Sequence, residues 1–129
     1  MKKYIAVSAT RNKVIENWGG TSVFTDEALT QLAETVSGKL VLDNFDQEKP
    51  VGKVVSGKND DGKLTIIVEI DDNFIIWDKH RIVPGFIVNQ DNWDESGKDV
   101  HRTIRDVESG NYGLTDQPAE QDLPEIKEV

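Results

Sequence analysis

Cysteine is absent from this chain of 129 residues. Its absence excludes disulfide bonds, thiolate metal sites and cysteine nucleophiles, and it fits synthesis in a reducing cytoplasm. Long hydrophobic runs are missing too, since the first apolar stretch, residues 4–7, is too short for a signal-peptide core or a membrane span. We therefore expect a protein that is neither exported through a signal peptide nor embedded in a membrane.

Basic residues are fewer than acidic residues. Lys and Arg number 15 against 24 Asp and Glu, which gives a formal net charge of −9. The basic residues form only a loose group near the start of the chain, whereas acidic residues gather at 71–72, at 91–95 and towards the end. Because such a surface repels a phosphate backbone, we expect no nucleic-acid partner.

The motifs of metal, cofactor and nucleophile chemistry are also missing. The two histidines, His80 and His101, lack the spacing that places two imidazoles on one metal ion. The acid-rich turns at 59–62 and 71–73 lack the loop length and the following glutamate of an EF-hand. No serine lies in a G-x-S-x-G motif, and the Gly-Gly pair lacks the spacing of a phosphate loop. The sequence predicts no metal site and no cofactor.

The length and the balance of residues favour one folded domain. Apolar residues make up 36% of the chain and charged residues 30%, a balance typical of a folded soluble domain. Beyond Pro118 the chain is acidic and interrupted by proline, so it reads as an extended arm. We predict a single β-rich domain over residues 1–119 and an acidic C-terminal arm over 120–129.

One helix is clearly indicated, over residues 25–37. Thr25 is a suitable N-cap, and the next two residues place negative charge in the first turn. Gly38 supplies a left-handed stop. The apolar residues then fall on one stripe, which predicts packing against one side of a sheet: Leu29, Leu32, Ala33 and Val36.

The remainder of the chain has the sequence pattern of short β-strands. β-branched runs alternate with turn residues, and a D-G pair at 61–62 is typical of a tight hairpin. Polar residues predict loops at 11–20 and 89–99. The fold class expected is α+β, mainly β, with strands at 3–10, 40–42, 51–55, 64–70, 74–77, 82–88, 100–107 and around 112–114.

The three tryptophans suggest different roles. Trp77 ends an apolar run and is predicted to lie in the core. Trp18 and Trp93 lie in polar loops, where an aromatic side chain either anchors the loop or contacts a partner. Both readings of Trp18 and Trp93 stay open, which makes them candidate interface residues.

Several segments resemble one family in order and spacing. Residues 41–54, VLDNFDQEKPVGKV, are similar to a stretch of the phage prohead (capsid maturation) serine proteases that reads V-L-x-N-H-D, a spacer, then P-I-G-x-V. Residues 61–70 resemble the D-G-G-L hairpin of that family, 83–86 its S-I-G-F segment, and 102–119 its later strands. The resemblance covers about 38–119, and it implies a small protease-like β-barrel with the helix packed against it.

The chain departs from this family at the residues that carry catalysis. Phe45 stands at the position of the family's histidine, Val83 at that of its serine, and Asn111 at that of a glutamate. Phenylalanine cannot take a proton and valine cannot attack a carbonyl group. The resemblance therefore implies a fold without its protease chemistry, and we expect no enzyme activity.

These observations lead to a functional hypothesis. We expect a noncatalytic phage virion protein, made in the cytoplasm of a bacterial host, that binds the major capsid protein of the shell as a head decoration or accessory protein in symmetric multiple copies. One alternative is a transient head-assembly factor or a regulator of the capsid protease. Another is an active serine peptidase with relocated residues, built from His80 or His101 and a loop serine.

Overall fold

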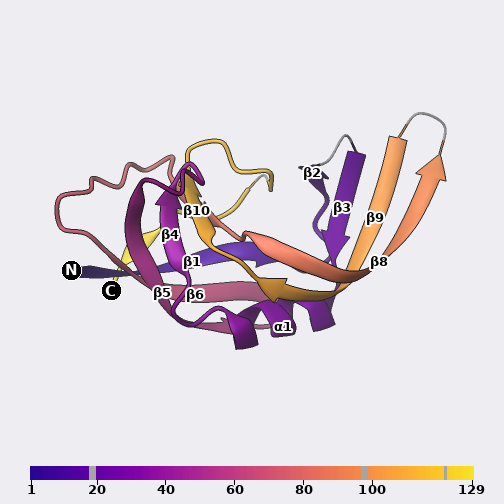
Figure 1. The fold of residues 1–129 in the computed structure, drawn as a ribbon, viewed down its shortest axis with the longest axis horizontal. Helices are drawn as coiled ribbons and strands as arrows, with labels where there is room; N and C mark the ends of the chain where they lie inside the picture. The colour runs from indigo at the N-terminus through magenta and orange to yellow at the C-terminus, as the bar shows by residue number, and fades with distance from the viewer. Residues whose placement is uncertain (18–19, 97–98, 121) are drawn as a thin grey trace.

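The fold consists of two β-sheets and one helix (Figure 1). A computed structural model describes residues 1–17, 20–96, 99–120 and 122–129, without the side chains of 16–17, 90–96 and 99–100. The expected class, α+β and mainly β, is confirmed. The elements are β1 (Lys2–Thr10), β2 (Ile15–Asn17), β3 (Gly20–Phe24), α1 (Asp26–Thr35), β4 (Leu40–Asp43), β5 (Pro50–Asn59), β6 (Lys63–Ile70), β7 (Arg81–Val83), β8 (Phe86–Ser96), β9 (Asp99–Ser109), β10 (Tyr112–Thr115) and β11 (Lys127–Glu128).

The larger sheet has seven strands in the order β11-β1-β6-β5-β4-β10-β7. At its centre β5 and β6 form the predicted hairpin, whose turn holds Asp61 at φ 49° and Gly62 at φ 80°. Asp and Gly tolerate this left-handed region better than other residues do. Alternate side chains of β6 point into the core, and all four have no exposed surface: Leu64, Ile66, Val68 and Ile70.

This sheet curls into a half-barrel, so that its edge strand β7 comes to lie against β1 (Figure 1). The hydroxyl group of Ser8 on β1 donates a hydrogen bond to the carbonyl oxygen of Ile82 on β7 (2.7 Å). A side chain thus connects two strands that are not neighbours in the sheet order.

The smaller sheet has the order β2-β3-β9-β8, and its strands project away from the half-barrel (Figure 1). The loop predicted at 89–99 is therefore wrong over most of its length, because β8 runs on to Ser96, and the loop predicted at 11–20 is interrupted by the short strand β2. Pairing with neighbouring strands satisfies the backbone of these polar segments, which composition alone did not indicate. Trp18 lies outside the described residues, and the side chain of Trp93 on β8 is not described.

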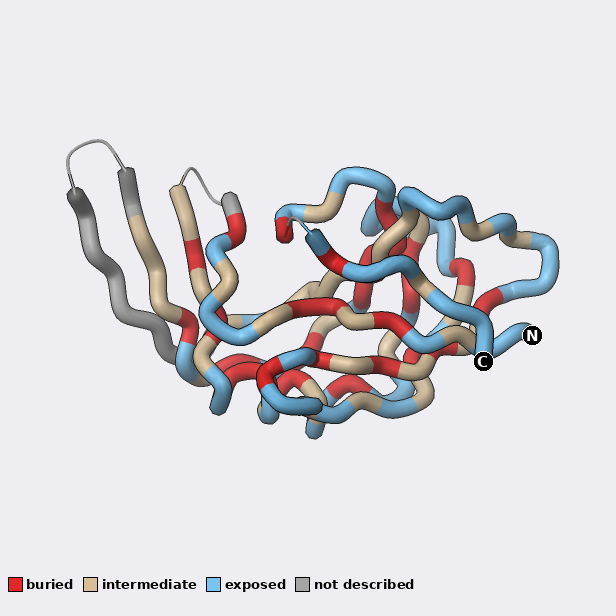
Figure 2. Tube along the Cα trace, turned by 180° about the vertical axis from the view of Figure 1, so that it is seen from behind, coloured by how far each residue is buried: buried red, intermediate tan, exposed pale blue. Residues whose placement is uncertain are grey.

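Helix α1 lies beneath the sheets, and it packs against β9 of the smaller sheet as well as against β5 and β6, whereas one sheet was predicted (Figures 1 and 2). The Thr25 hydroxyl accepts a hydrogen bond from the backbone N–H of Ala28 (3.1 Å), which confirms Thr25 as the N-cap. The helix ends at Thr35, two residues before the predicted end, and Gly38 adopts the expected left-handed conformation at φ 83°. The buried side chains of the helix are those of Ala28, Leu29 and Leu32.

Two predictions between β6 and β8 are wrong. Residues 74–77 form a loop, not a strand, and Trp77 is 67% exposed instead of lying in the core. The core positions of this segment are taken by Phe74 and Ile76, which pack against buried residues and leave Trp77 on the outside. The strand predicted at 82–88 is broken after Val83, where the chain passes from the half-barrel to the smaller sheet.

The C-terminal residues lie along the half-barrel. In the predicted arm, Glu120 and Leu123 are buried, and β11 pairs with Tyr4 and Ile5 of β1. The described residues include no helix that is long and apolar enough to cross a membrane.

Candidate functional site

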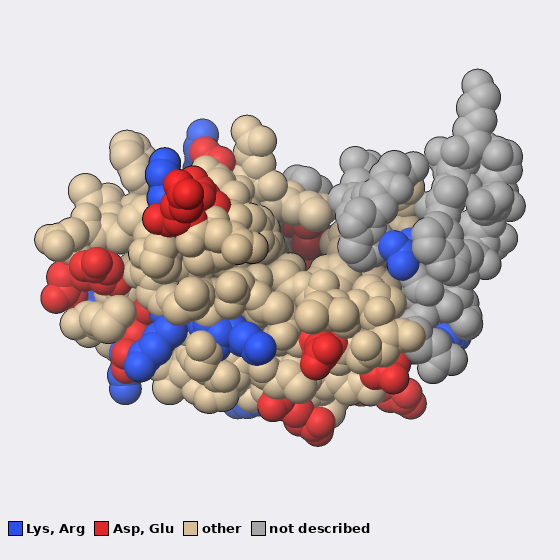
Figure 3. Space-filling view, in the orientation of Figure 1, with Lys and Arg blue, Asp and Glu red and all other residues tan. Residues whose placement is uncertain are grey.

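A pocket of about 420 Å³ opens where the half-barrel meets the smaller sheet. Figure 3 shows the surface hollowed beside the rounded body of the molecule. The volume falls within the range of pockets that hold small ligands or partner side chains. Residues from both sheets and from the segment after β10 line it: Ser8, Ala9, Ile15, Phe24, Asn44, Phe45, Val83, Pro84, Phe86, Thr115, Gln117, Ala119 and Glu120.

Two of the three residues singled out by the resemblance, Phe45 and Val83, line this pocket. Phe45 comes from the turn after β4, and Val83 ends β7. The ring of Phe45 lies on Gly113 of β10, where a Cβ atom would overlap it. Because Gly113 pairs with Val83 in the sheet register, the ring is brought to the neighbourhood of Val83.

The backbone at Phe45 is strained. Asn44 and Phe45 adopt left-handed conformations, with φ 50° and 60°. This region is uncommon for a bulky residue and costs on the order of 1–3 kcal/mol. The Phe45 side chain is nevertheless 42% exposed, so burial of the ring offsets only part of this cost. Such strain is typical of functional sites.

The hydroxyl groups of the pocket are directed at backbone atoms. Ser8 is 1% exposed, and its proton points to the carbonyl oxygen of Ile82. Thr115 Oγ1 accepts a hydrogen bond from the backbone N–H of Gln117 (3.1 Å). An activated nucleophile donates its proton to an imidazole or another base, whereas Ser8 donates its proton to a carbonyl group. Neither histidine belongs to the described lining of the pocket.

Glu120 brings a carboxyl group to the pocket wall. It is 5% exposed, and its two oxygens accept hydrogen bonds from the backbone N–H (2.8 Å) and the hydroxyl group (2.7 Å) of Thr10. Burial raises the pKa of the Glu120 carboxyl group, and the hydrogen bonds from Thr10 and the charge of Lys13 oppose this only in part. The site therefore combines apolar walls with one buried acidic group.

The other candidate residues lie apart from the described lining. Asn111 is exposed, and its side-chain oxygen accepts a hydrogen bond from the backbone N–H of Leu40 (3.1 Å). His80 lies in the loop before β7, where its Nδ1 accepts from the backbone N–H of Trp77 (2.9 Å). His101 on β9 makes a 2.8 Å hydrogen bond with the Thr21 hydroxyl group.

Sequence reasoning missed Ser8 and Glu120 as pocket residues. Ser8 sits within a predicted strand, and Glu120 was assigned to a terminal arm. Glu120 meets Thr10 across 110 residues of sequence, and no local pattern indicates that contact. Within the described parts of the chain, no group of three or more His, Asp or Glu side chains is placed to hold a metal ion.

Comparisons of the chain with protein-family models, curated proteins and solved structures give no match. What the pocket can do is therefore inferred from its own residues. They provide apolar surface for contact, one buried carboxyl group, and hydroxyl groups that form hydrogen bonds with the backbone.

Proposed function

We propose that this chain is a noncatalytic phage virion protein that binds the capsid shell, as a decoration or accessory protein built on a protease-like β-barrel. The observation that carries the proposal is the meeting of Phe45 and Val83 at one pocket. A catalytic histidine and serine must lie within hydrogen-bond reach of each other. Two positions selected only by resemblance lie 38 residues apart in sequence, yet they line the same pocket, as a former catalytic pair should.

The arrangement of the strands also supports a protease-like barrel. The resembling segments at 41–54, 61–70, 83–86 and 102–119 fall on successive strands from β4 to β10. These strands supply most of the half-barrel and the long β8–β9 hairpin. The resemblance thus follows a continuous part of the structure, as a shared fold requires.

Binding in place of cleavage follows from the chemistry of the pocket. Phe45 and Val83 add apolar surface where a protease needs a base and a nucleophile. The partner we propose is the major capsid protein, bound in multiple copies related by the symmetry of the shell. The net charge of −9 suits docking on a basic region of that shell.

Coexpression with the major capsid protein encoded in the same genome tests this function. The capsid protein should keep its full-length mass in intact-protein mass spectrometry, and the chain should copurify with the assembled shells. Specific cleavage of the capsid protein, abolished by His80→Ala or His101→Ala, would instead establish an active peptidase. Copurification with immature shells but not with mature heads would establish a transient assembly factor.

A further inference from the structure

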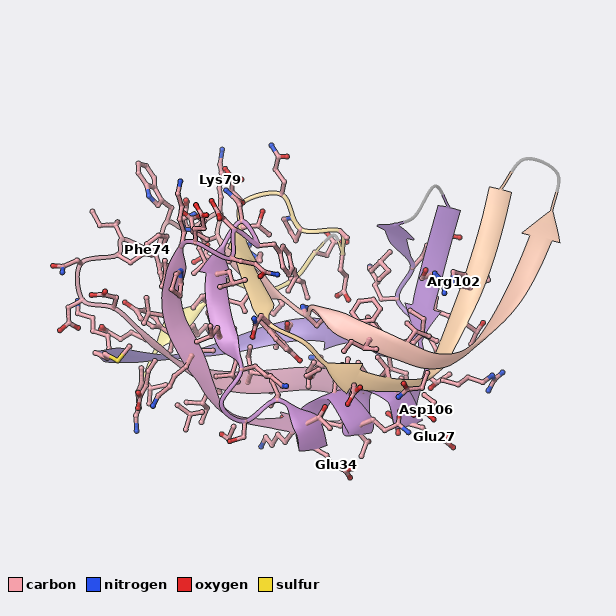
Figure 4. All side chains as sticks on the ribbon, viewed as in Figure 1. Glu27, Glu34, Phe74, Lys79, Arg102 and Asp106 are labelled. Atoms are coloured by element: carbon pink, nitrogen blue, oxygen red, sulfur yellow. The ribbon has the colours of Figure 1, made fainter. Side chains whose placement is uncertain are left out.

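The loop between β6 and β7, residues 71–80, displays two large apolar side chains to solvent. Ile75 is 73% exposed and Trp77 is 67% exposed, whereas Phe74 and Ile76 pack on the core. Figure 4 labels Phe74 and Lys79 on this loop, at the opposite end of the molecule from the tips of β8 and β9. Exposed aromatic and aliphatic side chains placed side by side are typical of protein interaction sites.

Hydrogen bonds hold the loop in this shape. The backbone N–H of His80 donates to the carbonyl oxygen of Trp77 (3.0 Å), and Nδ1 of His80 accepts from the backbone N–H of Trp77 (2.9 Å). Arg81 donates from its guanidinium group to the carbonyl oxygens of Asp78 (2.6 Å) and His80 (2.8 Å). The turn that carries Trp77 is therefore ordered before any partner arrives, which lowers the entropic cost of binding.

The start of the loop is fixed in the same way. The backbone N–H of Asp71 donates to the carbonyl oxygen of Val51 (2.8 Å), and Asp71 in turn accepts from the backbone N–H groups of Asn73 (3.1 Å) and Phe74 (3.0 Å). With Phe74 and Ile76 packed inward, the alternation of the chain sends Ile75 and Trp77 outward. The exposure of Ile75 and Trp77 therefore follows from the backbone conformation of the loop.

Acidic groups outnumber basic ones near this apolar pair, with Lys79 and the terminal ammonium group as the basic ones. Trp77 borders a groove of about 450 Å³ that is also lined by Asp78, Lys79, His80 and Asp116. Asp71 and Asp72 are exposed on the same loop, and Asp72 pairs with the terminal ammonium group (3.4 Å). Figure 3 shows acidic side chains at this end of the molecule, with some basic side chains among them.

The acidic charge of the loop indicates which class of partner binds it. An anionic lipid surface would be repelled by these carboxylates, and a second copy with a net charge of −9 would meet the same repulsion. A protein surface with an apolar depression and a basic rim complements both features of the loop. We propose that Ile75 and Trp77 anchor this chain to such a depression on the capsid shell, an inference that rests on the proposed function and names the surface that performs it.

Titration of assembled empty shells tests this surface. The full chain is mixed with shells of the major capsid protein encoded in the same genome, and bound chain is measured by cosedimentation. Trp77→Ala should weaken binding about tenfold or more, as expected for the loss of a central aromatic anchor, and Ile75→Ala should weaken it less. Raising the salt concentration should weaken binding of the unmodified chain, because the proposed attraction is partly electrostatic.

Ile87→Ala is the matched control, since Ile87 is 56% exposed on β8, in the other sheet. This variant should bind shells as the unmodified chain does, and all three variants should keep the circular dichroism spectrum and melting temperature. Equal binding by Trp77→Ala and the unmodified chain would overturn the assignment of the surface while leaving the proposed function intact.

Three further results would contradict the capsid shell as the binding partner of this loop. No binding of the unmodified chain to shells would contradict the proposed function and this inference together. Trp77-dependent dimers in sedimentation velocity, or Trp77-dependent flotation with phosphatidylglycerol vesicles, would assign the loop to a second copy or to lipid instead.

Discussion

Glu120 places an ionisable carboxyl group in the wall of a mostly apolar pocket. Its protonation state affects the stability of the folded protein. The two hydrogen bonds from Thr10 satisfy one lone pair on each carboxyl oxygen. Burial still raises the pKa of the carboxyl group above its ordinary value of 4.5. The folded protein therefore favours the neutral carboxyl group, and ionisation of Glu120 costs stability.

The pH dependence of stability follows from this direction. A raised pKa in the folded state gives a stabilising contribution that is fully present below pH 4.5, the unfolded value, and is lost as the pH rises through the folded pKa. Glu120→Gln removes the ionisation and keeps an oxygen that can accept from Thr10. Relative to the unmodified chain, this variant should gain stability as the pH rises from 4 to 7, by about 1.4 kcal/mol for each unit by which the pKa is raised.

Urea unfolding at a series of pH values measures this effect. Glu125 is exposed on the same C-terminal segment, so Glu125→Gln is the matched control and should show little change relative to the unmodified chain. A Glu120→Gln variant that loses stability relative to the unmodified chain as the pH rises would contradict the assigned direction of the pKa.

Individual residues differ in how far the sequence alone predicts them. The role of Thr25 follows from local chemistry, because an N-cap needs only a short polar side chain before an amphipathic run. Trp77 was misplaced because an apolar run does not say which of its members face inward. Glu120 could not be identified at all, since its burial depends on Thr10 at the other end of the chain.

Helix α1 packs against strands of both sheets and forms hydrogen bonds with the smaller one. The side-chain oxygen of Gln31 accepts a hydrogen bond from the backbone N–H of Val107 (2.8 Å), and Thr35 accepts one from that of Ser109 (2.8 Å). Thr25 caps the helix and also donates through its hydroxyl group to the carbonyl oxygen of Ile104 (3.3 Å). The first turn of α1 is thus connected to the smaller sheet, whose strand β3 contributes Phe24 to the pocket.

Replacing the cap should weaken this connection. Thr25→Ala removes the acceptor for the Ala28 N–H and the donor to Ile104, so the free energy of unfolding should fall by about 1 kcal/mol, with a range of roughly 0.5–2. Thr25→Ser keeps the hydroxyl group and should recover most of the loss. Thermal or urea unfolding followed by circular dichroism measures both variants, and equal stability of the two would contradict the capping role.

The strands show why some elements could be predicted and others not. In strand β6 every second residue from Leu64 to Ile70 is apolar, and the residues between them are polar except Ile67, so its inward face is apparent from sequence. Strand β3 pairs in parallel with β9, residues 21–24 lying beside 101–104. That pairing joins segments 80 residues apart, and the polar composition of residues 11–22 gives no sign of it.

On the scale of the whole molecule, the account rests on two surfaces formed by the described residues. The pocket lies between the half-barrel and the smaller sheet. The loop of residues 71–80 lies near the chain termini (Figure 1). Several strands of the half-barrel and the helix were predictable from local patterns, but the separate smaller sheet was not. Its position shapes the pocket, because β2, β3 and β8 supply Ile15, Phe24 and Phe86 to the lining.

The central claim, a noncatalytic protein of the phage capsid, is tested most directly by the protein composition of purified mature particles. Quantitative mass spectrometry should find this chain at full length, in a copy number fixed relative to the major capsid protein by the symmetry of the shell. Mature particles that contain no copies of the chain would contradict the account.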